Sequence, residues 1–310
     1  MRILVTGANG YLGRAVVDRL ISAGHEPVAM VRTERTLLPV EVRISDLLDE
    51  NSLRRALHEI DAVVHLAGLT RARESTVDPL SYFRVNTGGT VALLDAMEDA
   101  GVARLVFAST GAVYGTPDHQ PMTEELPDAP PHPYAASKLA AELAIEAQVR
   151  TGRLSATILR LMNVAGGFDS DPTRLVPRAL AAAAEYSKLE VNGDGKAVRD
   201  YLHLQDAAAA FGACLEKPPP LGETERYIIG SGHGTSVLDV VSAVENCVGR
   251  RVELVHRPPA PEPAVLIGDP SRAMSALSWS PHRSDIHTIV QDAARHRDAA
   301  TGVTEGSSGP

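Results

Sequence analysis

The stretch Thr6-Gly7-Ala8-Asn9-Gly10-Tyr11-Leu12-Gly13 decides the fold of this chain. It follows the apolar run Ile3-Leu4-Val5 and precedes an amphipathic segment over residues 15–20. This order predicts a strand, a tight glycine turn and a helix. Glycines at such a turn let a pyrophosphate approach the backbone, where free N–H groups and the helix dipole favour its negative charge. The stretch therefore predicts a turn that binds a dinucleotide.

Composition limits the classes of protein. The chain has 310 residues, of which 44% are hydrophobic, and this is ample for a sizeable buried core. Its formal net charge of −9 argues against nucleic acid and anionic membranes as partners, because both attract basic surfaces. No apolar stretch approaches the ~20 residues of a membrane span, so we expect a cytoplasmic protein. Cys214 and Cys247 are expected to be buried, reduced thiols, and no metal site is expected.

Short apolar runs alternate with helical patterns along the first half of the chain. Such alternation predicts an α/β fold with a Rossmann-type, doubly wound parallel sheet. The pattern loosens after residue 165, which predicts a smaller, irregular α/β lobe for substrate binding. We expect a dinucleotide-binding domain over 1–165, the second lobe over 166–300 and a disordered tail over 301–310. The predicted strands cover residues 2–6, 28–32, 40–44, 61–66, 104–108 and 155–161.

Two helices are predicted from their boundaries and composition. Asp78 and Pro79 suit the N-cap and the first helical position, and Gly101 suits the end of the same helix. The apolar segment over residues 175–186 predicts a helix of the second lobe. His65 stands in a strand pattern and is expected to be a packed core residue rather than a base, and the same expectation holds for His203.

A second motif, Tyr134-Ala135-Ala136-Ser137-Lys138, lies far downstream of the glycine turn. Its tyrosine and lysine are four residues apart in a helical pattern, so both side chains lie on one face. An unperturbed tyrosine has a pKa near 10, and lowering it to ~7 requires about 4 kcal/mol of preferential phenolate stabilisation. A neighbouring ammonium supplies much of this stabilisation, so the pair predicts an acid/base catalyst.

These motifs, together with Thr110 in the segment Phe107-Ala108-Ser109-Thr110-Gly111, resemble the extended short-chain dehydrogenase/reductase family. The likeness is to the sugar-nucleotide epimerase/dehydratase branch, and it runs from Arg2 to about Asp269. Four further segments recur in the family's order. They are residues 63–69, 86–90, 160–163 and 198–203.

The resemblance implies a role for each matching residue. Tyr134 is the acid/base, Lys138 assists it and holds the cofactor ribose, and Thr110 hydrogen-bonds the substrate hydroxyl. Asn163 and Arg199 grip the nucleotide diphosphate, and Arg257 adds a second grip although it is shifted by about two positions from the family's pattern. Arg199 has an alternative interpretation as a surface ion-pair partner of Asp200. The other cofactor-binding residues implied are Gly7, Gly10, Tyr11, Leu12, Gly13, Arg32, Asp46, Leu47, Leu66, Ala67, Gly68 and Asn86.

The resemblance further implies that residues 199–216 return to pack on the first domain, while the second lobe closes over a sugar nucleotide.

Two positions limit which reaction of the family the chain can catalyse. Gly111 and Ala112 stand where sugar-nucleotide dehydratases and decarboxylases of this family place carboxylates. Elimination of water needs an acid/base pair at these positions. The sequence therefore argues against both reactions.

The choice between NAD and NADP rests on Arg32, which ends the second predicted strand. NAD-selective members of the family usually have an aspartate there that accepts hydrogen bonds from the ribose. An arginine can instead pair with a 2′-phosphate, with Arg35 as a second cation. If Arg32 is only a solvated residue at the end of a strand, NAD binds through the remaining contacts. Both cofactors stay open, and Arg32 favours NADP.

Three functions follow from these residues. The leading one is an NAD(P)-dependent NDP-hexose 4-epimerase that oxidises and re-reduces carbon 4 of a UDP- or dTDP-hexose. The second is an NADPH-dependent reductase of an NDP-4-keto-sugar, which Arg32 favours. The third is a non-catalytic, NADP-sensing protein, against which the presence of Thr110, Tyr134 and Lys138 argues. The resemblance also implies a homodimer.

Overall fold

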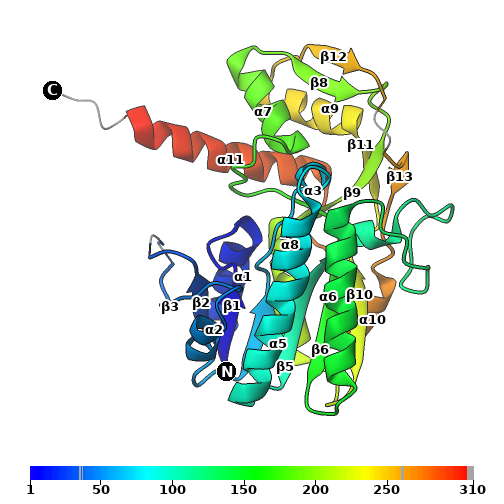
Figure 1. Cartoon of the computed structure of the whole chain (residues 1–310). Coiled ribbons are helices and arrows are strands. Elements are labelled where there is room, and N and C mark those ends of the chain that lie inside the picture. Colours follow the sequence, from blue (N-terminus) through cyan, green and yellow to red (C-terminus); the bar gives the residue numbers. More distant parts are fainter. Residues whose placement is uncertain (35, 37, 260–261, 306–310) are drawn as a thin grey trace.

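The computed structural model describes residues 1–34, 36, 38–259 and 262–305. A seven-stranded sheet forms its centre, and every pairing between neighbouring strands is parallel (Figure 1). This confirms the predicted Rossmann-type fold. In spatial order the strands are β10 (Thr224–Ile229), β6 (Ser155–Leu161), β5 (Arg104–Thr110), β4 (Ala62–His65), β1 (Arg2–Thr6), β2 (Glu26–Val31) and β3 (Glu41–Ile44).

Helices cover both faces of this sheet because its strands bury side chains on both sides. On β1, Ile3 and Val5 enter one hydrophobic cluster and Leu4 enters the other, as expected when successive side chains point to opposite faces. The first cluster includes α1 (Tyr11–Ser22) and α8 (Leu204–Glu216), with α10 (Ser271–Leu277) beside them. The second includes α2 (Glu50–Ala56), α5 (Gly89–Ala100) and α6 (Pro133–Val149).

The helix predicted to begin at Asp78 forms in three parts. The Asp78 carboxylate accepts a hydrogen bond from the Ser81 N–H, and Pro79 lies in the first turn. Helix α4 (Pro79–Tyr82) runs into a π-helical segment, η1 (Phe83–Gly88), and then into α5. Gly101 ends it in a left-handed conformation, with φ of 69°. The π-helical segment, which the sequence did not indicate, contains Asn86; such segments are frequent at functional sites.

The second lobe lies beyond the carboxyl ends of the central strands (Figure 1). It has its own hydrophobic cluster, built from α7 (Leu175–Glu185), α9 (Val237–Val248) and α11 (Ile286–Glu305) with strands of its own. Those strands are β7 (Asn163–Ala165), β9 (Val198–His203), β11 (Gly234–Ser236) and β13 (Val265–Leu266) in one sheet, and β8 (Leu189–Asn192) with β12 (Leu254–Arg257) in another. Two short helices, α3 (Ala72–Ser75) and η2 (Gly111–Tyr114), complete the elements.

Several details differ from the sequence-based picture. Strand β10 lies at the edge of the central sheet although it comes from beyond residue 165. Of the segment expected to return to the first domain, α8 packs against α1, whereas β9 lies in the smaller sheet. Helix α11 continues to Glu305, and residues 306–310 lie outside the described part. Cys214 is buried, but Cys247 is exposed, because it lies in the last turn of α9, at the edge of the lobe's core. None of the described helices is long and apolar enough to cross a membrane.

Candidate active site

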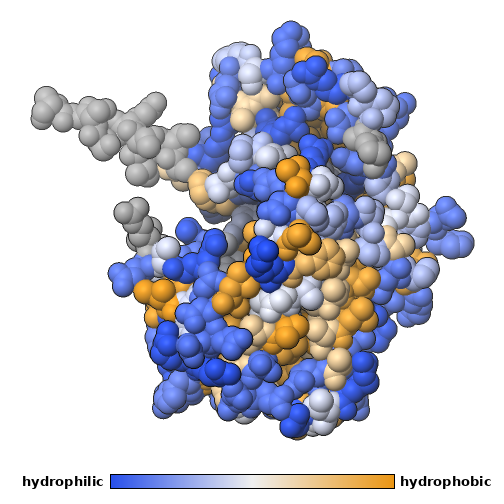
Figure 2. Space-filling model, in the orientation of Figure 1, coloured by the Kyte–Doolittle hydropathy of each residue, from blue (hydrophilic) through white to orange (hydrophobic). Residues whose placement is uncertain are grey.

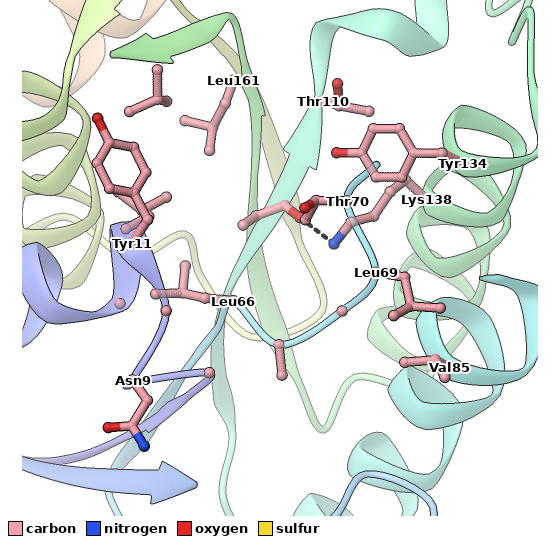
Figure 3. A pocket seen from close by; sticks show the side chains of 18 of the residues that line it. Asn9, Tyr11, Leu66, Leu69, Thr70, Val85, Thr110, Tyr134, Lys138 and Leu161 are labelled. Carbon is pink, nitrogen blue, oxygen red and sulfur yellow. Dashed lines mark hydrogen bonds between the residues drawn. The ribbon is translucent and has the colours of Figure 1, made fainter. Parts of the chain in front are cut away.

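A cavity of about 1030 Å³ opens at the carboxyl ends of β1, β4 and β5 and is closed on its other side by the second lobe. This is the edge at which open α/β sheets bind ligands. Both lobes supply its walls. Figure 3 shows Tyr11 and Leu66 on one side of the space and Thr110, Tyr134 and Lys138 on the other. The predicted site residues that line it are Gly7, Gly10, Tyr11, Leu12, Gly13, Arg32, Asp46, Leu47, Leu66, Ala67, Gly68, Thr110, Tyr134, Lys138 and Asn163.

The glycine turn is built so tightly that side chains would not fit. A Cβ atom on Gly13 would lie 2.2 Å from the carbonyl oxygen of Gly7. Gly7 has φ of 68°, a conformation that L-residues rarely adopt, and a Cβ there would lie 2.9 Å from the Ala67 nitrogen. The first turn of α1 leaves backbone N–H groups without intrahelical acceptors at this wall of the cavity. The turn therefore offers an anion a close approach to the backbone.

A chain of buried hydrogen bonds fixes the neighbouring strand ends. Thr6 Oγ1 accepts from the Leu66 and Ala67 N–H groups at 3.1 and 3.0 Å, and it contacts His65 Nδ1 at 2.7 Å. Thr90 donates to a backbone carbonyl, so it accepts from His65 Nε2 at 3.0 Å. His65 thus carries its proton on Nε2 and accepts at Nδ1. His65 is buried, as expected of a core residue, and this burial, with the nearby lysine charge second, lowers its pKa to about 3.

Asn86 lies behind the cavity wall rather than on it. It is buried in the π-helical segment, where its Oδ1 accepts from the Leu69 N–H at 2.7 Å. Its amide donates to the Leu69 carbonyl at 3.0 Å and to Ser137 Oγ at 2.9 Å. A Cβ on Gly68 would lie 2.8 Å from Asn86 Oδ1. Asn86 therefore holds the loop after β4 against α6, the helix that carries Tyr134.

Thr110, Tyr134 and Lys138 come together at the cavity. Thr110 ends β5, and its side chain lies beside that of Tyr134 from the first turn of α6 (Figure 3). His132 caps the helix by accepting from the Ala135 N–H at 3.2 Å. One turn after Tyr134, the Lys138 ammonium lies 4.6 Å from the centre of the Phe107 ring. The predicted grouping of a hydroxyl, a phenol and an ammonium is therefore present.

Burial sets the protonation of this group in the absence of ligands. It lowers the pKa of the Lys138 ammonium to about 8, and the charge of Glu142 partly opposes the fall. It also raises the pKa of the Tyr134 phenol above its usual range, and the neighbouring Thr110 hydroxyl offsets part of the rise. A phenolate at this position therefore requires a nearby positive charge.

Arg32 and Asp46 line the part of the cavity next to β2 and β3. Arg32 follows the last residue of β2 and is exposed. The Asp46 carboxylate accepts a hydrogen bond from the Leu48 N–H at 2.9 Å. Arg35, the second cation considered from the sequence, lies outside the described residues.

The two predicted diphosphate arginines do not line the cavity. Arg199 donates to the Pro263 carbonyl at 2.9 Å and pairs with Glu262 at 3.3 Å. It points to the same face of β9 as Tyr201, which does line the cavity. Arg257 is exposed on β12 and pairs with Glu190 in the neighbouring strand. The contact of these arginines with a diphosphate stays a prediction.

The alternative partner of Arg199 is wrong. Asp200 is fully buried and points away from it, because successive residues of a strand face opposite sides. Its carboxylate accepts hydrogen bonds from the Ser231 N–H at 2.7 Å and from the Ser231 hydroxyl at 2.6 Å. Asp200 therefore serves the packing of the two lobes rather than an ion pair at the surface.

Sequence reasoning missed Arg174, which lines the side of the cavity formed by the second lobe. It is the N-cap residue of α7 and has no capping hydrogen bond of its own. Its guanidinium lies 5.1 Å from the centre of the Tyr11 ring and pairs with Asp169 at 3.1 Å. The sequence feature that could have indicated Arg174 is its place directly before the predicted apolar helix. The positive charge of Arg174 and the N-terminus of α7 therefore lie together at this wall of the cavity.

Gly111 and Ala112 directly follow Thr110 in the chain. They begin the short helix η2, where the Ala112 N–H donates to Thr110 Oγ1 at 3.2 Å. A Cβ on Gly111 would lie 2.6 Å from Met162 Sδ. A carboxylate at position 111 would therefore collide with Met162 as packed here.

Comparison with known proteins gives the family. The model of the NAD dependent epimerase/dehydratase family matches residues 3–230. A curated relative, UDP-glucose 4-epimerase from Streptomyces lividans, is 35% identical, and the match covers 94% of each chain. The solved structure of UDP-glucose-4-epimerase from Stenotrophomonas maltophila, with bound NAD and formylated UDP-arabinopyranose, is 31% identical with a TM-score of 0.90, and the match covers 98% of this chain and 99% of that chain.

A second solved relative is UDP-glucose 4-epimerase from Bifidobacterium longum in complex with NAD+ and UDP. It is 28% identical with a TM-score of 0.89, and the match covers 97% of this chain and 99% of that chain. The family model, the curated relative and the structures agree with the likeness seen in the sequence motifs. The chain belongs to the NAD-dependent epimerase/dehydratase family.

Proposed function

We propose that this chain is an NDP-hexose 4-epimerase that uses a nicotinamide dinucleotide. One observation carries the proposal: Thr110, Tyr134 and Lys138 meet at the cavity, while Gly111 and Ala112 leave the adjoining positions without carboxylates. This group can take a proton from a sugar hydroxyl and return it. It lacks the acid/base pair that expels water. The similarity to UDP-glucose 4-epimerases supports the same activity.

The glycine turn suits the cofactor, because Gly7 and Gly13 have no room for side chains and the backbone can lie against a pyrophosphate. A nicotinamide cofactor held at this turn would supply the acceptor and the donor of the hydride for carbon 4 of the sugar. Tyr134 takes the proton of the 4-hydroxyl and later returns it. Thr110 orients that hydroxyl, and the Lys138 charge favours the phenolate form of Tyr134.

We assign the sugar nucleotide to the second-lobe side of the cavity, where Asn163 and Arg174 lie. A guanidinium suits a diphosphate because its planar fork donates two hydrogen bonds to neighbouring oxygens. Arg174 is held by Asp169 and stacks on Tyr11, so its position is fixed in advance. The solved relatives that bind UDP or UDP-sugars support a UDP-hexose over a dTDP-hexose.

For the cofactor we propose NAD, which the solved relatives contain. They give no support for NADP. Arg32 is the observation that favours NADP, because it lines the cavity and can pair with a 2′-phosphate. The same residue favours the second function, an NADPH-dependent reductase of a 4-keto sugar nucleotide. The two functions differ in whether an external reductant is consumed.

We also propose a homodimer. Helices α5 and α6 pack against each other, and large apolar side chains on α4, α5 and α6 are exposed, including Leu80, Val91 and Leu143. Figure 2 shows hydrophobic residues gathered over this face of the molecule. Exposed apolar patches commonly mark protein interfaces. Sedimentation of the wild-type chain and of Leu143→Lys tests the proposal, since only the wild type should have twice the monomer mass.

Turnover of purified enzyme on UDP-galactose, with no added reductant, tests the function. We expect UDP-glucose to form until the two sugars reach equilibrium, and NAD to be released from the denatured enzyme. A chain that arrives without cofactor, binds NADPH and converts only keto sugars is instead the reductase. No turnover on any NDP-hexose or keto sugar would contradict both catalytic functions and favour the non-catalytic alternative.

A further inference from the structure

Strand β5 and helix α6 are joined at three successive residues of the strand. On the helix, the three partners are spaced four residues apart, so they lie along one face. Two of these partners belong to the proposed catalytic group, whereas the third, Glu142, has no role so far. Ala108 is hydrogen-bonded to Lys138 and Ser109 to Glu142, while Thr110 lies beside Tyr134.

Glu142 is a fully buried carboxylate. Arg160, which is also fully buried, donates to it from Nη2 at 2.6 Å and from Nε at 3.2 Å. Arg226 Nε lies 3.5 Å from the same carboxylate. Taking such ions out of water costs free energy that their mutual attraction often fails to recover, and apolar residues of similar volume are often as stable. Stability alone therefore does not account for a carboxylate at this position.

The charge of Glu142 acts on Lys138, which lies one helical turn earlier. Burial lowers the pKa of the ammonium, and the attraction of Glu142 opposes that fall. Glu142 also accepts a hydrogen bond from the hydroxyl of Ser109, the residue directly before Thr110. The carboxylate thus contacts the catalytic strand and supports the charge of the catalytic lysine. The titratable groups around Lys138 and Glu142 are Tyr134 on α6, His65 on β4, Arg160 on β6 and Arg226 on β10.

We propose that Glu142 is a positioning residue: through Ser109 it holds α6 in register with β5, and its charge keeps the Lys138 ammonium protonated. Neither Glu142 nor Ser109 carries out a step of the reaction. The proposal rests on the proposed function, because it gives Glu142 a role through the residues assigned there. It explains why a buried ion pair lies beside the catalytic group, where an apolar pair would satisfy packing.

The lysine titration can be observed directly, because the chain has only four lysines. Lys188, Lys196 and Lys217 are exposed, so in carbon-13 lysine NMR of the full chain the Lys138 signal is the one that titrates lowest and disappears in Lys138→Arg. In Glu142→Gln, which keeps the shape and removes the charge, the Lys138 midpoint should fall by about one pH unit. Glu146→Gln, one turn later on α6, should leave it unchanged. An unchanged midpoint in Glu142→Gln overturns the proposal.

Kinetics test the positioning part. Ser109→Ala removes the link to the strand and keeps the Glu142 charge, so kcat should fall several-fold while the Lys138 midpoint stays at its wild-type value. A normal kcat in Ser109→Ala would contradict this part. If Glu142→Gln does not fold, Glu142→Asp replaces it: with the charge kept, the midpoint should stay and kcat should fall. A wild-type enzyme that does not epimerise would contradict the proposed function alone, because the NMR titration needs no turnover.

Discussion

The Lys138 ammonium donates a hydrogen bond to the Ala108 carbonyl at 2.8 Å, so a positive charge from α6 is fixed at the carboxyl end of β5. The same site is buried, which places the pKa of this ammonium at about 8. Its positive charge is present below that pH and is lost above it. We therefore expect kcat/KM, which reports the free enzyme, to fall above about pH 8. A kcat/KM that stays constant up to pH 10 would contradict the role of Lys138.

Tyr134→Phe removes the proposed proton carrier and keeps the ring, whose edge packs against Tyr82. Turnover should drop by about 100-fold to 10,000-fold, the usual contribution of general acid/base catalysis, with little change in cofactor affinity. Tyr82→Phe is the matched control, because its hydroxyl donates to the Arg71 carbonyl and it should keep normal turnover. Retained activity in Tyr134→Phe would assign the proton transfer elsewhere, and Thr110 would be tested next.

Gly13→Ala tests the cofactor turn. Its Cβ would lie 2.2 Å from the Gly7 carbonyl oxygen, so the turn must move. We expect a loss of about 1–3 kcal/mol in the free energy of unfolding and at least tenfold weaker cofactor binding, measured by calorimetry. In Gly88→Ala, where the nearest atom would be 3.8 Å away, both quantities should change little. Equal cofactor binding in the two variants would contradict a pyrophosphate site at this turn.

Arg32→Ala tests the choice of cofactor. A hydrogen bond to a charged group is worth roughly 1.5 to 3 kcal/mol, so loss of a 2′-phosphate contact should weaken NADP binding by an order of magnitude or more and spare NAD. Arg54→Ala, which removes an exposed arginine paired with Asp99, should alter neither affinity. Equal losses for NAD and NADP in Arg32→Ala would show that Arg32 does not contact the 2′-phosphate.

Arg174→Gln tests the proposed diphosphate site. The variant should raise KM for UDP-galactose at least tenfold and leave the affinity for the dinucleotide near its wild-type value. Arg178→Gln serves as control, because Arg178 lies one turn further along α7 and donates to the Glu190 carbonyl. If Arg174→Gln has a normal KM, the diphosphate is bound elsewhere, and Arg199 becomes the residue to change.

Local patterns predicted much of the fold and of the catalytic group. The glycine turn joins one strand to the next helix, and the Tyr134–Lys138 spacing lies within one helix. In such short segments, residues close in sequence are also close in space. Strand β10 was not predicted, because half of its residues, Thr224, Glu225 and Arg226, are polar, and its pairing with β6 joins segments far apart in sequence. Its place depends on a crossover of the chain that no local pattern contains.

The substrate side was predicted less well for a related reason. Arg174 and Arg257 are both arginines beside apolar segments, and only the packing of the second lobe decides that the first lines the cavity while the second pairs with Glu190. Asn86 was assigned to the cofactor from resemblance; in the structure its amide bonds Leu69 and Ser137, and a contact with the cofactor stays a prediction. Which of these side chains faces the cavity follows from tertiary contacts, which the spacing of residues in the sequence does not contain.

The fate of the hydride tests the central claim most directly. Enzyme, UDP-galactose and no external reductant are incubated in deuterium oxide, and the ring carbons of the product are examined by NMR. We expect UDP-glucose without deuterium at carbon 4, because the hydride leaves that carbon and returns to it without exchange with water. Product that appears only with stoichiometric NADPH oxidation from a keto sugar would contradict the epimerase and support the reductase. A 4-keto-6-deoxy product from UDP-galactose would contradict both.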